Sequence, residues 1–529
     1  MKRRSKPDVG DIGSKDGAGK NSGRKMRKDA PREQSLSQAA VRSLKWSYLG
    51  ACAKVVSSLG AGIVLARLLG PQPFGQIAVA TVLVGLGMLL ADSGFGVWLI
   101  QRPTIQPRDI EIALTFQLCF GLILTAGTFF GADQLAGLFQ KPEIAPVFRA
   151  LSPVYTLQAL GQVPASVLRR GMRHKNVQIA QIVSYVLGYL FVGVSMAAEG
   201  FGVWSLIAAQ LCQSLANLVL LAYVSRIRWR LRFEKPPKDF FGFGGSVLAS
   251  NIINWGIESV DMLLVSRFYG LVDTGLYNRS QALVENPVSL LVGNLQQVSV
   301  TTYARAAHKP QAVGRTLKAV LGLLALVVFP ICLAAAAVPS TLVLGVLRSD
   351  WSAAAPIVVP LLLATPFFCL MAMLGSYAHG VGRPDLEFKA QMLSLGLGSV
   401  LLALMVRFGS FRLFAWAVAG FMMLRFLVLA VRMRGLADLG PLFWAKIIGR
   451  ACGLGLAVAA SAKAADALIS GWGMPPEVRL SAVIVAAAAS SGILWFALKR
   501  RLLSTDERWL LQKISTTAGV PARLAGALS

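Results

Sequence analysis

The sequence predicts an all-α polytopic membrane protein with about fourteen transmembrane helices. Hydrophobic residues make up 55% of the 529 residues, and most of the apolar stretches reach the ~20 residues that cross a bilayer core. Short polar loops separate these stretches, and Lys and Arg concentrate in alternate loops. In chain order the predicted spans are 44–66, 74–100, 110–132, 145–168, 176–197, 202–225, 242–266, 275–300, 317–338, 353–379, 390–406, 412–431, 443–462 and 480–498.

The distribution of basic residues predicts the orientation of these spans. The first 45 residues hold 13 Lys and Arg, and residues 499–529 hold 6. Each even-numbered loop holds at least two, with six in 226–241, whereas no odd-numbered loop holds more than two. Because the basic side of a membrane protein is the cytoplasmic side, both termini should be cytoplasmic. The net charge of +28 therefore reflects topology and contact with anionic membrane lipid, and no nucleic-acid partner is expected.

A weak internal repeat predicts two lobes of six helices. Arg67, Gly70 and Gly75 follow the first span, and Arg267, Gly270 and Gly275 follow the seventh at an offset of 200 residues. An even number of crossings separates the two copies, so the lobes should be parallel repeats around a central cavity, plus two C-terminal helices. The predicted units are 1–43 (disordered basic cytoplasmic tail with an interfacial helix near Ser35–Ser47), 44–225 (first lobe), 226–241 (basic cytoplasmic linker), 242–431 (second lobe), 432–498 (last two spans) and 499–529 (cytoplasmic tail).

The repeated Arg-x-x-Gly-x4-Gly motif predicts a tight turn outside the cytoplasm. Glycine allows a positive φ and close approach of helices. An arginine at the end of a span can extend its charge to the membrane interface. A structural role in the turn is therefore favoured for both copies of the motif over contact with a substrate.

Polar residues inside the seventh and eighth spans predict a wet cavity, because such residues are rare within a membrane. Asn251, Asn254, Glu258 and Asp261 are spaced by 3, 4 and 3 residues, so they share one helical face. The eighth span carries Arg279, Gln281 and Glu285, and Pro287 is expected to break or kink it. The first lobe is less polar and contributes Lys54 and Asp92.

Two interpretations of these charges stay open. In the first, they form buried ion pairs between helices, for example Arg279 with Glu258 or Asp261. In the second, Lys54 and Arg279, with Asn251, Asn254 and Gln281, hold an anionic head group such as a diphosphate. One carboxylate then carries H⁺ or Na⁺ for coupling, with Asp92, Glu258, Asp261 and Glu285 as candidates. Arg149 and Arg425 lie close enough to span ends to reach the interface, and no functional role is predicted for them.

No enzymatic motif occurs in the sequence. There is no P-loop, HExxH or nucleophile elbow, and the three His residues lack the spacing of metal ligands. The six cysteines are isolated within apolar spans, so neither a disulfide framework nor a metal site is expected. The chain is therefore expected to be a membrane transporter without a cofactor, apart from a coupling cation.

Several segments resemble one known family. They are KWSYLGACAKVVSSLGAGIVLARLLGPQPFGQIAVATVLVGLGMLLADSGFGVWLIQR (45–102), LRRGMRHKNVQIAQIVSYVLGYL (168–190), GFGVWSLIAAQL (200–211) and VSRFYGLVDTGLYNRSQALVENP (265–287). This pattern resembles the Wzx-type lipid-linked oligosaccharide flippases, the polysaccharide transporters of the multidrug/oligosaccharidyl-lipid/polysaccharide exporter superfamily. The resemblance covers about residues 38–435 and fades over the last two spans.

The resemblance implies a fold of fourteen helices in two lobes and a cationic cavity that accepts an undecaprenyl-diphosphate-linked glycan. It makes Lys54 and Arg279 the best candidates for cavity positions. The implied function is alternating-access translocation of a repeat unit across the inner membrane for exopolysaccharide, capsule or O-antigen synthesis. A polysaccharide polymerase and a chain-length regulator are then expected partners. The alternatives are a cation-coupled drug antiporter of the same superfamily, a membrane-embedded glycan ligase, and an assembly scaffold that transports nothing.

Overall fold

The computed structural model describes residues 53–91, 105–234, 239–306 and 308–517, together with Gly50 and Leu99. The expected tail of residues 1–43, the interfacial helix near Ser35–Ser47 and Asp92 lie outside the described residues. The described part of the chain contains helices and no strand. This all-helical architecture confirms the predicted fold class, since only internally hydrogen-bonded helices or closed barrels satisfy the backbone within a bilayer.

The first half of the bundle contains helices at all six predicted span positions. Residues 174–198 form one rod that passes through a π-helical segment. In chain order the elements are residues 53–69, α2 (Pro71–Ala91), α4 (Pro107–Phe130), α5 (Ala132–Leu138), η1 (Pro142–Ile144), α6 (Ala145–Leu151), α7 (Pro153–Arg170), α8 (His174–Tyr185), η2 (Val186–Gly193), α9 (Val194–Ala198) and α10 (Val203–Ser225).

The second half and the C-terminal helices follow the same pattern. Their elements are α11 (Asp239–Phe268), α12 (Leu271–Ala306), α13 (Pro310–Ala337), α14 (Pro339–Val346), η3 (Ser349–Ala354), α15 (Ala355–Gly380), α16 (Pro384–Phe408), α17 (Phe411–Arg432), α18 (Pro441–Ser470), α19 (Pro476–Leu502) and α20 (Thr505–Thr517). Helix α12 runs through Pro287 without interruption, so the expected break at this proline does not occur.

Ten of the described helices are long and apolar enough to cross a membrane. Helices α11 and α12 are not among the ten. These two carry the polar residues of the predicted seventh and eighth spans, including Glu258, Asp261 and Glu285. Their polarity fits a position inside the bundle, where they face other helices and cavities instead of lipid.

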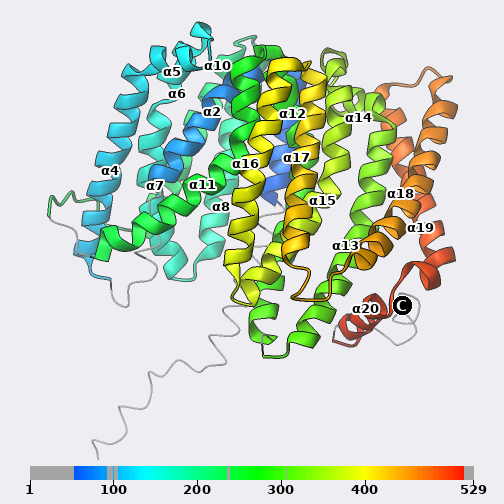
Figure 1. The fold of residues 1–529 in the computed structure, drawn as a ribbon. Helices are drawn as coiled ribbons and strands as arrows, with labels where there is room; N and C mark the ends of the chain where they lie inside the picture. Colours follow the sequence, from blue (N-terminus) through cyan, green and yellow to red (C-terminus); the bar gives the residue numbers. More distant parts are fainter. Residues whose placement is uncertain are drawn as a thin grey trace, which may run out of the picture.

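The two halves lie side by side (Figure 1). Helices α4, α7, α8 and α10 pack on one another in the first half, and α13, α15, α16 and α17 do so in the second. Helices α2 and α12 pack against each other at the centre, and α11 crosses α2. Helix α18 packs against α13 on the outside of the second half, and α19 packs against α18 and α14. The interface between the halves is therefore built mainly by α2, α11 and α12.

The predicted C-terminal tail contains the helix α20, which packs against α13. Its Glu507 is only 1% exposed and accepts a hydrogen bond from Arg450 Nη2 at 3.2 Å. The same carboxylate accepts the backbone N–H of Ser504. The buried Glu507 carboxylate, in the first turn of α20, thus accepts hydrogen bonds from Arg450 of α18 and from the backbone of its own helix start, and it holds α20 against α18.

Replacing Glu507 with alanine should lower the free energy of unfolding by about 1–3 kcal/mol, because Arg450 loses its carboxylate partner and the Ser504 N–H loses its acceptor. The matched control is Asp506→Ala, which removes the exposed ion pair with Arg315 (2.7 Å) and should change stability by less than about 1 kcal/mol. Thermal unfolding of the purified protein in detergent measures both. Equal destabilisation by the two variants would contradict the proposed role of the buried pair.

Candidate functional site

The first half encloses a polar cavity of about 320 Å³. It lies among α7, α8 and α10, and Lys54 and Arg169 are its charged lining residues. The other polar residues that line it are amides and hydroxyls: Gln158, Gln162, Gln181, Ser184, Gln210, Gln213, Ser214 and Asn217. We call this space the amide cavity. The sequence predicts a cavity position for Lys54, and the structure adds the amides and Arg169 to it. The sequence signal for the amides is the spacing of Gln210, Gln213 and Asn217 by 3 and 4 residues, which places them on one helical face.

The second half encloses an acidic cavity of about 380 Å³. Glu258, Asp261 and Glu285 line it, with Gln281 and the single cation Arg425. Both oxygens of Asp261 are occupied, because Tyr277 donates its hydroxyl to one and the backbone N–H of Met262 donates to the other at 2.8 Å. Gln281 Nε2 donates to Glu285 at 2.9 Å. Three carboxyl groups and one guanidinium line this space, so acidic side chains outnumber cations there.

Arg425 differs from its predicted role. The sequence predicts that it reaches a span end, but the structure places it in the acidic cavity beside the Phe421 ring, with its guanidinium carbon 5.7 Å from the ring centroid. Its Nε is buried without a hydrogen-bond partner among the described residues. Its position in the middle of the 411–432 helix is the sequence signal that points to this location. The hypothetical ion pair of Arg279 with Glu258 or Asp261 is also not found, and Arg425 is the cation that shares their cavity.

Arg279 lies at the interface between the halves. Its guanidinium stacks over the Phe74 ring of the first half, 4.2 Å from the centroid, and hydrogen-bonds to Asn278 Oδ1 at 3.1 Å. A small cavity of about 30 Å³ beside it is lined by Ser58 and Gly62 of the helix at 53–69. Among the described residues no carboxylate forms an ion pair with Arg279. This cation is therefore held by an aromatic ring and an amide oxygen.

The structure separates residues that the sequence had assigned to one cavity. Lys54 lines the amide cavity, Arg279 lies at the interface, and Gln281 and the three carboxylates line the acidic cavity. Asn251 and Asn254 are exposed on α11 and do not line the acidic cavity. The helical spacing places them on the Glu258 face, but the residues of α11 that line the acidic cavity begin at Ile257.

The repeated motif brings the two halves into direct contact. A Cβ on Gly75 would overlap the carbonyl oxygen of Leu271, and a Cβ on Gly275 would overlap that of Pro71. The two glycines also lie next to each other across the interface. Gly70 has the expected positive φ of 70° at the turn before α2, whereas Gly270 has no positive φ. The expectation of a positive φ is therefore wrong for Gly270, and the second glycine of each copy serves close helix approach instead.

The arginines of the motif cross between the halves near this contact. Arg67 donates to the carbonyls of Val346 at 2.8 Å and Gly345 at 2.7 Å, at the C-terminal end of α14. Arg267 donates to the carbonyl of Gly137 in α5 at 3.2 Å. Each arginine thus binds a helix of the opposite half at the end of the bundle that carries α5 and α14, the upper end in Figure 1.

Two further contacts reinforce the same end. The indole of Trp351 is fully buried and donates to the carbonyl of Ala66 at 2.9 Å. Lys141, in the loop after α5, donates to the carbonyl of Ser266. Burial lowers the pKa of the Lys141 ammonium, although the nearby Glu143 and Asp273 carboxylates oppose this effect. We call the Gly75–Gly275 contact and these four crossing residues the closed contact between the halves.

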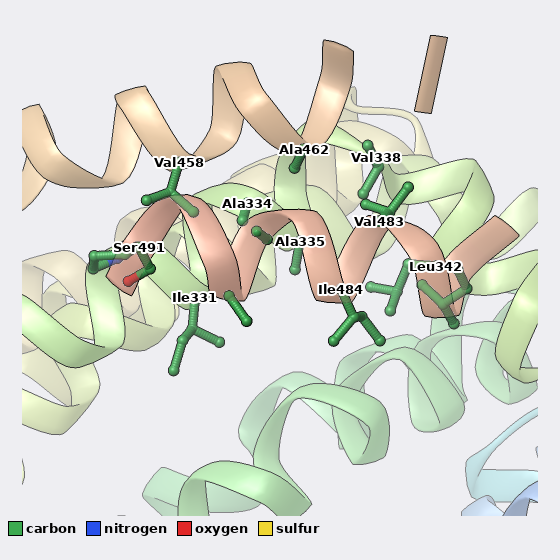
Figure 2. A pocket seen from close by; sticks show the side chains of 14 residues that line it. Ile331, Ala334, Ala335, Val338, Leu342, Val458, Ala462, Val483, Ile484 and Ser491 are labelled. Carbon is green, nitrogen blue, oxygen red and sulfur yellow. The ribbon is translucent and has the colours of Figure 1, made fainter. Parts of the chain in front are cut away.

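An apolar groove of about 280 Å³ runs along the outside of the second half. Helices α13, α18 and α19 form it, and Ile331, Val458, Val483 and Ile484 are among its lining side chains (Figure 2). Ser491 is a lone polar residue in the lining. Alanines at 334, 335 and 462 leave room between the helices. Such a surface suits a hydrocarbon chain.

Comparisons with known proteins identify the family and the fold. Residues 64–356, more than half of the chain, match the family described as polysaccharide biosynthesis proteins. The teichuronic acid biosynthesis protein TuaB of Bacillus subtilis (strain 168) is 27% identical over 345 residues, which cover 64% of this chain and 71% of TuaB. The succinoglycan biosynthesis transport protein ExoT of Rhizobium meliloti (strain 1021) is 28% identical over 358 residues, which cover 66% and 71% of the two chains.

Two solved structures share the fold. The lipid II flippase MurJ in an inward closed conformation aligns with a TM-score of 0.67 at 13% identity, covering 85% of this chain and 99% of MurJ. An inward-facing multidrug transporter of the MATE family aligns with a TM-score of 0.57 at 16% identity, covering 73% and 95%. On this evidence, the chain has the two-lobed helical fold of these transporters, and it belongs to the polysaccharide biosynthesis protein family.

Proposed function

We propose that this protein is a flippase that moves an undecaprenyl-diphosphate-linked oligosaccharide across the bacterial inner membrane by alternating access. The observation that carries this proposal is the closed contact at one end of two lobes that each enclose a polar cavity. A carrier that rocks one lobe against the other needs such a contact on one side and binding groups between the lobes. The family and the names of TuaB and ExoT support a glycan as the cargo.

The basic loops assign the sides of the membrane. Both termini are cytoplasmic, and the end that carries α5 and α14 faces away from the cytoplasm. The closed contact then seals the outer side. Arg169, at the C-terminal end of α7, lies at the cytoplasmic end of the amide cavity. The protein therefore accepts its substrate from the cytoplasmic leaflet in this state.

Lys54 and Arg279 bind the diphosphate. Lys54, Ser58 and Gly62 follow one another at intervals of four residues, so they lie along one face of the helix at 53–69. Because Ser58 and Gly62 border Arg279, the two cations are separated by about 6–12 Å along that helix. A diphosphate extends far enough to contact an ammonium on one side and a guanidinium on the other, and both donate charge-assisted hydrogen bonds to phosphate.

The polyprenyl tail occupies the apolar groove of Figure 2. Replacing Ala487, which lines the groove, with phenylalanine should reduce transport at low substrate concentration about tenfold. The phenylalanine side chain would fill part of the groove, so about two methylene groups of the polyprenyl tail could no longer be buried there. Val485→Phe is the matched control, because Val485 lies on the same helix, is 67% exposed and does not line the groove. Equal transport rates for both variants in proteoliposomes would contradict a role of the groove.

The acidic cavity carries the coupling cation, H⁺ or Na⁺. Its three carboxylates exceed its one cation, and carboxylates inside a membrane protein commonly carry protons or ions. In proteoliposomes, transport by the wild type should respond to an imposed proton or sodium gradient, and Asp261→Asn should abolish that response. The control Glu199→Gln alters an exposed carboxylate between α9 and α10 and should leave the response intact. If transport by the wild type does not change with either gradient, coupling is refuted, and downhill exchange remains as the mechanism of transport.

The function itself is tested by deleting the gene and locating the lipid-linked oligosaccharide. The flippase function is supported if this lipid accumulates in the cytoplasmic leaflet of the deletion strain and is cleared when the wild-type protein is restored. If the precursor reaches the outer leaflet without the protein, the proposal fails and the antiporter or scaffold interpretation replaces it. If it accumulates unligated in the outer leaflet, the protein acts as a glycan ligase. As a flippase, the protein delivers its product to a polysaccharide polymerase and its chain-length regulator.

A further inference from the structure

The amide cavity is unusual for the interior of a membrane protein. It is lined by six amide side chains and two serines from three adjacent helices. Gln210, Gln213 and Asn217 share one face of α10, at intervals of three and four residues. Gln158 and Gln162 share one face of α7 in the same way. Because burying an amide is costly unless it is hydrogen-bonded, so many amides around one space indicate a ligand or ordered water within it.

Among the described residues, these amides have few hydrogen-bond partners. Gln158 Nε2 donates to Ser214 Oγ at 3.2 Å. Gln210 Oε1 accepts the hydroxyl of Tyr189, which lies in the π-helical segment η2. The Oδ1 atom of Asn217 is buried with no hydrogen-bond partner in the described part of the protein. The π-helical segment thus orients one wall of the cavity, while Asn217 keeps an acceptor free for a ligand.

The chemistry of the lining selects the class of ligand. A carboxamide offers two donors and one acceptor, and a sugar hydroxyl both donates and accepts. Lys54 and Arg169 only donate, and they are positively charged. Among the described residues no carboxylate lines this cavity, in contrast to the acidic cavity of the other half. A hydroxyl-rich, uncharged sugar attached to an anionic group therefore fits the first half and is disfavoured in the second.

We propose that the amide cavity binds the sugar residue next to the diphosphate and recognises its hydroxyl groups. This inference rests on the flippase function proposed above and assigns the glycan-binding site to α7, α8 and α10. Lys54 lines this cavity and also lies on the helix face that leads to Arg279. A sugar bound in the cavity can therefore stay attached to a diphosphate that lies between Lys54 and Arg279. At about 320 Å³ the cavity is near the lower end of ligand pockets, about 300–1,000 Å³, which suits part of a repeat unit.

The test compares two ligands of the purified protein. One is the lipid-linked oligosaccharide extracted from the deletion strain, and the other is undecaprenyl diphosphate, which lacks the sugar. The double variant Gln213→Leu/Asn217→Leu should weaken binding of the oligosaccharide lipid about tenfold, the effect of losing about two neutral hydrogen bonds. Its affinity for undecaprenyl diphosphate should be unchanged, which also shows that the variant is folded.

Gln117→Leu is the matched control. Gln117 is a fully buried amide of α4 whose side-chain atoms have no partner among the described residues, and it does not line the cavity. It should bind both lipids as the wild type does. If the double variant binds the oligosaccharide lipid as tightly as the wild type, the sugar site is refuted and the flippase proposal stands. If the wild type binds neither lipid, the flippase proposal itself fails.

Discussion

Replacing Gly75 with alanine should reduce transport at least about tenfold. The added Cβ would overlap the backbone carbonyl of Leu271, and backbone atoms of a packed helix cannot move aside as a flexible side chain can. The two lobes would then be unable to close at the outer end, so the protein would lose one of the two states that alternating access requires. Gly275→Ala should act in the same way, because its Cβ would overlap the carbonyl of Pro71.

Two measurements check this expectation. Transport of the lipid-linked oligosaccharide gives the loss of function, and Gly60→Ala is the control, since a Cβ there meets nothing within 4 Å. Opening of the closed contact is measured by the labelling rate of a cysteine introduced at Thr274, which is fully buried there. It should react faster with a membrane-impermeant maleimide in the Gly75→Ala background, with the native cysteines removed. Unchanged transport and unchanged labelling would show that the contact need not close during transport.

Replacing Arg279 with alanine should weaken binding of undecaprenyl diphosphate about ten- to a hundredfold. A hydrogen bond to a charged group contributes about 1.5–3 kcal/mol, and each 1.4 kcal/mol corresponds to a factor of about ten in affinity. Arg279→Lys should recover only part of the binding. Lysine restores the charge, but it lacks the planar, bidentate guanidinium and the stacking over Phe74.

The control for this change is Arg412→Ala, which removes an exposed cation from the same half. Titration of the purified variants with undecaprenyl diphosphate should separate the two positions. An effect of equal size at Arg412 would indicate general attraction of the lipid to a basic protein. Full affinity in Arg279→Ala would place the diphosphate elsewhere and leave Arg279 as a packing residue at the lobe interface.

The general architecture was accessible from the sequence because it depends on local patterns. Each of the fourteen predicted positions coincides with a helix in the described part of the chain. Ten of these helices are recognised by length and apolar content, whereas α11 and α12 carry too many polar residues to meet that criterion. The repeat of Arg67 and Gly75 at Arg267 and Gly275 was visible because both copies follow a long apolar span. The motif also implied close helix approach, although it gave no indication that the two copies contact each other.

The sites depended on which helices are neighbours, and the sequence does not state this. Arg279, Glu258 and Asp261 were grouped because they are close in the chain, yet packing separates them. Arg279 turns toward Phe74 of the other half, and Arg425, more than 150 residues from Glu258 and Asp261, joins them in one cavity. Polar residues on helices that are distant in the chain, such as α11 and α17, share a cavity only if the bundle packs those helices with their polar faces toward each other.

The sequence by itself therefore determined the helical membrane fold, the repeat and the polar character of the interior. The fold and the polar interior follow from hydropathy and spacing within single segments, and the repeat follows from matching two segments 200 residues apart. Only the tertiary structure decided that the amides of α7, α8 and α10 surround one space, and that Gly75 meets Gly275. Both features join residues from separate helices, so they arise from the crossing of packed helices, which the spacing within any one helix does not indicate.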